Sequence, residues 1–203
     1  MYAVHSITYH RNSDPDEIIH QILATGKLLP LADRLPVDET GMQPVDVFAG
    51  DHYFVFLRVR DSWPNQSSAF VFDAEDLIAR GAAFRKSDLL LSYWAEAKSV
   101  IDEFRLIDAF NATECGILQD LMHYVDDKFE EPYMRYYGDS QARTVVRILQ
   151  ARLGQIAEEG TYYGKEALRL LSDPNSRSGY SELVWRGPLP ISLALPESPV
   201  FQR

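Results

Sequence analysis

The sequence predicts an α+β fold in which a split sheet, mixed or antiparallel, is interrupted by a helical insertion. Short alternating apolar segments of the kind that form strands occur near both ends of the 203-residue chain, at 2–10, 52–59, 68–74 and 182–195. From about 87 to 171, apolar residues instead recur three and four positions apart, as in amphipathic helices. The chain contains no internal repeat, so we interpret the helical block as an insertion and not as a second domain. We therefore expect one domain over 1–203 with an insertion at about 87–171.

The charge of the chain bears on its partners. With 30 acidic and 20 basic residues the net charge is −10, which opposes a broad surface that tracks nucleic-acid phosphates but leaves room for a local basic groove. The single cysteine, Cys115, cannot form an internal disulfide. No run approaches the ~20 apolar residues of a membrane span. We therefore expect a cytoplasmic protein that does not enter a membrane.

The first helix is predicted from its boundary residues. Asp14 is a favourable N-cap, Pro15 suits the first helical position, and Glu17 stands three residues after the cap, as in a capping box. Gly26 can adopt the left-handed conformation that ends a helix. The stretch between these signals carries one apolar stripe, so a helix over 15–25 should pack on the sheet.

Two strands joined by a turn are predicted in the segment before the helical block. The segments "HYFVFLRV" (52–59) and "SAFVFDA" (68–74) are rich in β-branched and aromatic residues and are joined by a polar turn containing "WPN". A short helix should follow, capped by Asp73 and ended by Gly81. The Pro- and Gly-rich segment 31–50 predicts a loop of a length that is often functional.

Several common chemical signatures are absent from the sequence. There is no GxxxxGK[ST] phosphate loop, no GxSxG nucleophile turn and no HExxH zinc motif. The five histidines are dispersed, and no cluster of cysteine and histidine has the spacing of zinc ligands. We therefore expect no metal site.

A set of short segments nevertheless occurs in a familiar order. A strand with a histidine is followed by "ILATGKLLP", "GDHYFVFL", "AFVFDAEDLI" and finally the Glu-led "SELVWRGPLPISL". This order resembles the ADP-ribosyltransferase superfamily over residues 1–85 and 176–195, but not over the helical block. The resemblance implies a split-sheet core, NAD as substrate, cleavage of the nicotinamide glycosidic bond, and transfer of ADP-ribose to a macromolecular acceptor, either protein or nucleic acid.

Glu182 is the catalytic residue that the resemblance implies. Breaking the glycosidic bond of NAD develops oxocarbenium character on the ribose, and a fixed carboxylate can stabilise that charge. The small residues Ser178, Gly179 and Ser181 just before it leave room for a ligand. The other interpretation is a solvent-facing charge at the edge of a strand.

The resemblance also implies that a histidine of the first strand contacts the ribose of NAD. The superfamily spacing is His-x-Thr, whereas this chain offers His5 with Thr8, and His10 shortly after. In a regular strand His5 and Thr8 point to opposite faces, while His10 shares a face with Thr8. All three remain candidate cofactor-binding residues, and each has the alternative role of an ordinary polar residue in a half-exposed strand.

Three further candidates for binding NAD come from the strand that follows the long loop. The resemblance implies an aromatic ring that packs on nicotinamide, for which Tyr53 and Phe56 are the candidates, although core packing is an equal use for either ring. Arg58, and also Arg85, could pair with pyrophosphate, because guanidinium groups match phosphate oxygens. Both could equally be solvated charges.

The acceptor and the class of function remain open. Members that modify arginine often carry an acidic residue two positions before the catalytic glutamate, and Tyr180 stands there. One enzymatic alternative is an RNA 2′-phosphotransferase, which uses NAD to remove a 2′-phosphate. The alternative from another class is a non-catalytic binding or neutralising module with the helical block as its interface. A toxin, effector or defence enzyme of this kind could have a neutralising partner protein.

Overall fold

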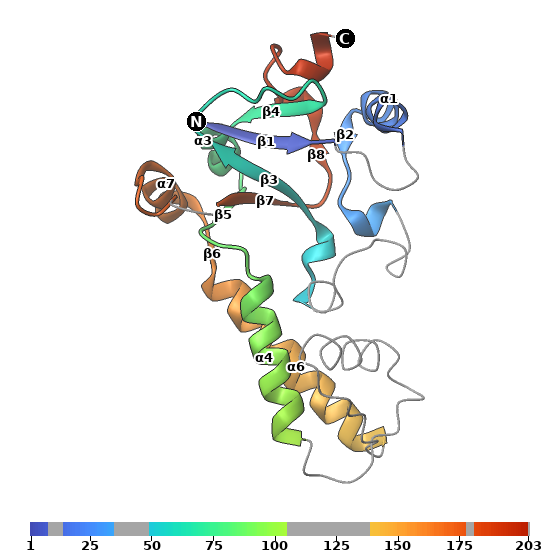
Figure 1. The fold of residues 1–203 in the computed structure, drawn as a ribbon, viewed down its shortest axis with the longest axis vertical. Helices are drawn as coiled ribbons and strands as arrows, with labels where there is room; N and C mark the ends of the chain where they lie inside the picture. Colours follow the sequence, from blue (N-terminus) through green and yellow to red (C-terminus); the bar gives the residue numbers. More distant parts are fainter. Residues whose placement is uncertain (8–13, 35–48, 105–138, 178–180, 203) are drawn as a thin grey trace. The chain divides into compact units, whose positions relative to one another are not determined.

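The computed structural model describes residues 1–7, 14–34, 49–104, 139–177 and 181–202 (Figure 1). The chain divides into two compact units. The first, here the sheet unit, comprises 1–40, 53–88 and 161–203, and the second, here the helical unit, comprises 41–52 and 89–160.

The sheet unit is built on a six-stranded sheet. Its strands are β1 (Tyr2–Ser6), β3 (Phe54–Arg60), β4 (Ala69–Asp73), β5 (Ala83–Arg85), β6 (Thr161–Tyr162) and β7 (Glu182–Arg186). They lie in the order β4-β1-β3-β7-β5-β6, and all these neighbours pair antiparallel. A separate two-stranded sheet joins β2 (Lys27–Leu28) to β8 (Leu189–Pro190). The predicted α+β class is confirmed, and the sheets are antiparallel.

The strand boundaries differ from the predicted ones in ways that local geometry explains. The first strand ends at Ser6, and residues 8–13 lie outside the described part of the chain. The 3₁₀ turn η3 (Asp51–Tyr53) delays the start of β3. The predicted closing strand is divided at Gly187, whose φ of 78° makes a turn between β7 and β8, and the 3₁₀ turn η5 (Ile191–Leu193) follows.

The helix predicted over 15–25 is confirmed as α1 (Pro15–Thr25). The Asp14 side chain accepts a hydrogen bond from the Asp16 N–H at 2.9 Å, which satisfies one of the amides left open at a helix start. Gly26 adopts φ 70°, and its N–H donates to the Ile22 carbonyl at 2.8 Å.

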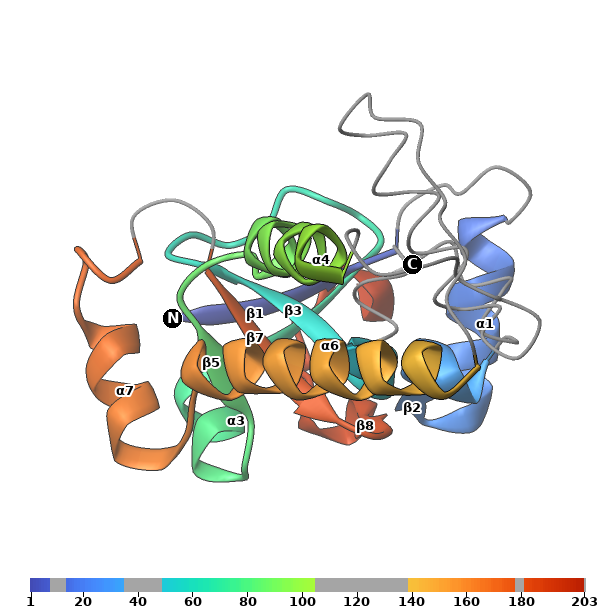
Figure 2. The same cartoon turned by 90° about the horizontal axis from the view of Figure 1, so that it is seen from below.

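One face of the six-stranded sheet carries the main hydrophobic core. Alternate strand residues, among them Leu57, Phe72 and Leu183, point to this face. They pack with apolar side chains of α1, α3 (Ala74–Ala79) and α7 (Gly164–Ser172). The helix α3 and the strand β8 both lie on this side of the strands (Figure 2). We call it the core face, and the other side the charged face.

The helical unit contains α4 (Leu90–Phe104) and α6 (Asp139–Glu159), which pack against each other (Figure 1). Their buried residues include Tyr93 and Ala97 on α4 and Leu149 and Leu153 on α6. A 3.0 Å ion pair joins Arg152 to Glu96. No helix in the described ranges is both long enough and apolar enough to span a membrane.

The boundary of the insertion differs from the predicted range of 87–171. Both β6 and α7 belong to the sheet unit, because β6 pairs with β5 and α7 contributes Leu170 to the core. The helical unit accordingly ends at Gly160. Predicted helical segments within 105–138 lie outside the described residues. Two further 3₁₀ turns, η1 (Leu31–Asp33) and η6 (Pro199–Gln202), complete the sheet unit.

Removing a buried side chain from β3 should destabilise the protein far more than removing an exposed one of the same type. Leu57 is 0% exposed and Leu91 is 79% exposed. We expect Leu57→Ala to lower the free energy of unfolding by about 2–5 kcal/mol, through lost transfer energy and the cavity left behind. Leu91→Ala should change it by no more than about 0.5 kcal/mol. Urea unfolding measures both, and equal losses would contradict the proposed core.

Candidate functional site

A row of side chains crosses the charged face of the sheet at the level of Glu182. Cross-strand partners in an antiparallel sheet share a face, and the printed registers link one residue from each of the six strands. In strand order the row is Val71, Val4, Arg58, Glu182, Arg85 and Thr161. Glu182 therefore lies between two arginines, one on each neighbouring strand.

Glu182 and Arg85 form a buried ionic pair. Arg85 Nη1 lies 4.0 Å from Glu182 Oε1, and their side chains are only 3% and 7% exposed. At this distance the two atoms attract each other as an ion pair but lie beyond hydrogen-bonding range, which is about 2.7–3.2 Å. Because the surroundings are shielded from water, the attraction is stronger than at the surface. The carboxylate and the guanidinium therefore depend on each other's charge.

Arg85 is held in place by neighbours on two strands, β3 and β6. Its Nε donates to Thr161 Oγ1 at 3.1 Å, and its guanidinium carbon lies 5.4 Å from the centre of the Phe54 ring and 5.8 Å from that of Phe56. A cation within about 6 Å of an aromatic face is attracted to it. These contacts fix the positive charge beside Glu182 and keep it from moving into solvent.

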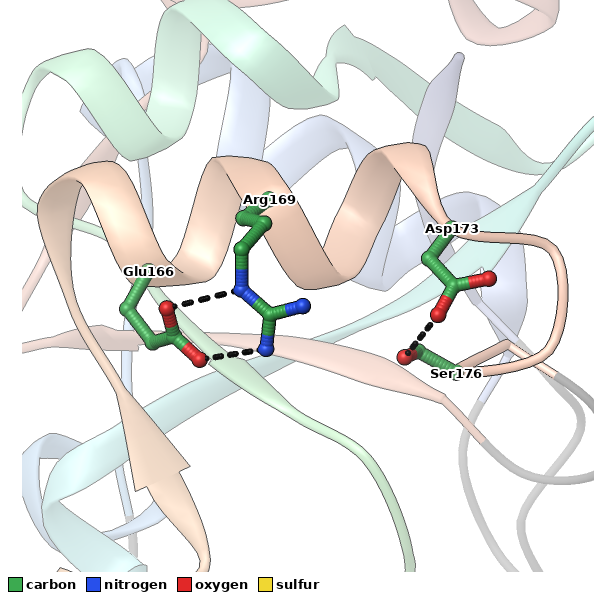
Figure 3. Close-up of polar contacts among 4 residues, drawn as sticks. All are labelled: Glu166, Arg169, Asp173 and Ser176. Atoms are coloured by element: carbon green, nitrogen blue, oxygen red, sulfur yellow. Dashed lines mark hydrogen bonds and ion pairs between the residues drawn. The ribbon is translucent and has the colours of Figure 1, made fainter.

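The chain is also anchored just before Glu182. Asp173 follows α7 and closes a turn. Its carboxylate accepts a hydrogen bond from Ser176 Oγ at 3.0 Å (Figure 3) and another from the Asn175 N–H at 2.9 Å. These two hydrogen bonds to its carboxylate are the main reason that the pKa of Asp173 is lowered. Arg177 then forms an ion pair with Asp61, just after β3.

A groove opens on the charged face next to Glu182. It has a volume of about 250 Å³ and is lined by Val4, Ser6, Arg58, Arg60, Ser62, Trp63, Pro64, Asn65 and Gln66. Its floor is formed by β1 and β3, and one wall is the turn between β3 and β4. Arg58 is shared, since it is opposite Glu182 in the sheet and also lines the groove.

His5 lies on the opposite face of the sheet from Glu182. Val4 is in register with Arg58, and Arg58 with Glu182, so these three side chains share the charged face. The next residue of β1, His5, must point to the core face. Of the two histidines expected within reach of Glu182, His5 is therefore separated from it by strand alternation, and His10 lies outside the described residues.

The surroundings of His5 are those of a neutral imidazole. Its Nδ1 lies 3.0 Å from the Phe56 carbonyl oxygen, which can only accept, so Nδ1 carries the proton. Burial lowers the pKa of His5 below its usual range, the bond to Phe56 acts in the opposite direction, and the charge of Arg34 lowers the pKa further. The His5 side chain thus adds a hydrogen bond between β1 and β3 beyond their last paired residues, Val4 and Arg58.

The structure brings only some of the other predicted cofactor-binding residues close to Glu182. Thr8 and His10 lie outside the described residues. Tyr53 is 52% exposed, and its carbonyl accepts from the Gly187 N–H at 2.9 Å. Phe56 and Arg58 both belong to the charged face, Phe56 beside Arg85 and Arg58 opposite Glu182. Two of the six candidates therefore lie near the predicted catalytic residue: Arg58 opposite it in the sheet, and Phe56 against the arginine that pairs with it.

Sequence reasoning did not identify Arg60 and Trp63 as site residues. The segment "RVR" over 58–60 contained the relevant signal, because alternation puts both arginines on one face of a strand. The sequence around Trp63 indicates only a turn, and the position of this residue beside β1 depends on the pairing of distant segments. It packs edge-on against Tyr2, with ring centres 5.2 Å apart and planes at 87°.

Comparisons with known proteins give no relative to which the site can be compared: no protein-family model, curated protein or solved structure matches this chain. Within the described ranges, no group of three His, Cys, Asp or Glu side chains is arranged to hold a metal ion. The row of side chains through Glu182 and the groove beside it are therefore the features of the described residues that bear on function.

Removing Arg85 should destabilise the sheet, because Glu182 would keep its buried charge and lose the buried guanidinium beside it. We expect Arg85→Ala to lower the free energy of unfolding by about 3 kcal/mol or more. Arg169→Ala is the control, since Arg169 forms a 2.7 Å ion pair with Glu166 on the exposed side of α7 (Figure 3). It should have little effect, because exposed pairs contribute little. Similar losses in urea unfolding would contradict the buried pair.

The stability of the protein should depend on pH through His5. In the unfolded chain its pKa is about 6.5, and in the folded protein it is lower. Between these two values the unfolded chain binds more protons, so stability falls as the pH falls through 6.5. Glutamine can still donate to Phe56 but does not titrate. We expect His5→Gln to lose less unfolding free energy than wild type between pH 7.5 and 5.5.

The matched control for this measurement is His20→Gln. His20 is exposed on α1, and its Nδ1 bonds the Asp16 carbonyl at 2.7 Å. This substitution should leave the difference between pH 7.5 and 5.5 as it is in wild type. If His5→Gln and wild type lose stability in parallel, burial of a neutral His5 is not the cause.

Proposed function

We propose that this protein is an NAD-dependent ADP-ribosyltransferase that uses Glu182 to cleave the bond between nicotinamide and ribose. The observation that carries the proposal is the position of Glu182. It is a buried carboxylate on a central strand, flanked by Arg58 and Arg85 in one row, and this row borders an open groove. The fold we propose is the split-sheet fold of that superfamily.

The chemistry requires a fixed negative charge. As the glycosidic bond breaks, its electron pair goes to the nicotinamide nitrogen, which leaves as a neutral ring, and the ribose develops oxocarbenium character. A carboxylate held rigidly near that ribose stabilises the transition state more than the ground state. The acceptor then forms a bond to the ribose carbon and loses a proton. Glu182 has the rigidity for this role, because Arg85 and its neighbours limit its movement.

The arginines divide between two roles. Arg85 is buried and committed to Thr161 and Glu182, so we assign it to positioning the carboxylate. Arg58 is exposed on the same row and lines the groove, so its guanidinium can meet the pyrophosphate of NAD. Phe54 and Phe56, packed on Arg85, offer aromatic surface to a nicotinamide ring.

A non-catalytic binding module is the second candidate, and the position of His5 favours it. The resemblance implies a histidine and a glutamate in one cleft, whereas His5 and Glu182 occupy opposite faces. If the module interpretation is correct, the protein binds a partner or NAD without releasing nicotinamide. The proposed acceptor of the transferase is a macromolecule, either protein or nucleic acid.

Replacing Glu182 by glutamine tests the catalytic role while preserving shape. With the full chain and NAD, we expect Glu182→Gln to lower the turnover of nicotinamide release by about 100-fold or more, because only the charged form stabilises the transition state. The affinity for NAD should change by only a few-fold. Nicotinamide is measured by chromatography and NAD binding by calorimetry.

Glu166→Gln is the control, since it removes an exposed carboxylate that also pairs with an arginine. It should release nicotinamide at the wild-type rate. Near-normal release by Glu182→Gln would remove this residue from the mechanism. NAD binding by wild type with no release would favour the binding module.

A further inference from the structure

The groove beside Glu182 is chemically distinct from the rest of the charged face. Its lining combines two arginines, one tryptophan and two side-chain amides on a floor that includes Val4. We propose that this groove binds a nucleotide 5′-phosphate, with the base against Trp63 and the phosphate on Arg58 and Arg60. The assignment of that nucleotide to NAD, as opposed to an acceptor strand, rests on the proposed function.

The size of the groove fits one nucleotide unit and no more. Its volume of about 250 Å³ is below the range of about 300–1,000 Å³ that is typical of sites for drug-sized ligands. A dinucleotide would therefore place only one half here. Because Arg58 also stands opposite Glu182, the other half would extend along the row toward the carboxylate.

The two arginines are placed to share one phosphate. Arg58 and Arg60 are two positions apart on β3, so they point to the same face with Cα atoms about 7 Å apart. Both are exposed and line the groove. Guanidinium groups at this spacing can donate to different oxygens of one phosphate, which is the geometry that arginine favours.

Carboxylates close to this end of the sheet have other partners. Asp61 follows Arg60 directly and forms an ion pair with Arg177. Asp73 is in register with Tyr2 on β1, and its side chain accepts from the Asp76 N–H at 2.9 Å as the cap of α3. These contacts reduce the repulsion that an acidic chain would otherwise exert on an incoming phosphate.

Trp63 supplies the aromatic surface for a base. It is half-buried, and its edge-to-face contact with Tyr2 holds the ring in one orientation. Stacking on such a ring suits any base, because every base has a π-face. Hydrogen bonds can come from Asn65 and Gln66 on the same turn, and Gln66 is itself fixed by a hydrogen bond from the Ser6 hydroxyl to its side-chain oxygen.

Calorimetry with the full chain and three probes tests the groove. We expect adenosine 5′-monophosphate to bind more tightly than either adenosine or inorganic phosphate, since only the nucleotide uses both ends of the groove. Trp63→Ala and Arg60→Ala should each weaken its binding about tenfold or more. Trp63→Phe should stay within a few-fold of wild type, because it keeps an aromatic face.

Arg80→Ala is the control, because Arg80 is an exposed arginine on α3, also in the sheet unit, and does not line the groove. It should bind adenosine 5′-monophosphate as wild type does. No binding of the nucleotide, equal loss in Arg80→Ala, or unchanged affinity in both Trp63→Ala and Arg60→Ala would overturn the proposal.

Competition then identifies the source of the nucleotide. Displacement of NAD by adenosine 5′-monophosphate assigns the groove to the adenylate half of NAD. Displacement of a four-nucleotide DNA strand, with the affinity for NAD unchanged, assigns it to a nucleic-acid acceptor. If the nucleotide displaces neither, the groove is not part of a substrate site, and its link to the proposed function is contradicted.

These results are separable from those on the proposed function. If the protein binds the nucleotide through Trp63 and Arg60 but releases no nicotinamide, the groove proposal stands and the transferase proposal fails. The opposite result is also possible. If no nucleotide binds in the groove, and Trp63→Ala and Arg60→Ala both release nicotinamide at the normal rate, the transferase proposal stands and the groove proposal fails.

Discussion

The ionic pair between Glu182 and Arg85 is the constraint on which the rest of the site depends. Burying a charge is costly unless a partner compensates it, so each of these side chains requires the other. Apolar residues of similar size would fill the same space at no greater cost in stability, which suggests a role for the charge itself. The contacts of Arg85 with Thr161, Phe54 and Phe56 then follow, since they fix the charge that Glu182 needs.

Strand alternation distributes the remaining chemistry between two faces. The core face buries the apolar residues under α1, α3 and α7, and it also receives His5, whose imidazole is held neutral by burial. The charged face carries Glu182 and the groove. The pairing of β3 with both β1 and β7 determines which residues share a face. Arg58 is in register with Val4 on one side and with Glu182 on the other, so all three lie on the charged face. A substrate that uses Glu182 must therefore approach from the charged face.

The sequence predicted what local signals determine and missed what distant pairing determines. The bounds of α1 follow from Asp14 and Gly26, whose effects act within one turn of the helix. The strands β5 and β6 have three and two residues, too few for a recognisable alternation, and they exist only through pairing with other strands. The motif predicts Glu182 as a site residue. That it shares a face with Arg58, and not with His5, could be seen only from the strand register.

A crystal structure of the protein with a non-hydrolysable NAD analogue would show whether Glu182 meets the substrate. We expect the nicotinamide ribose to lie on the charged face within contact distance of Glu182, with Arg58 at the pyrophosphate. The contradicting result is an analogue bound on the core side of the sheet against His5, with Glu182 touching no part of it.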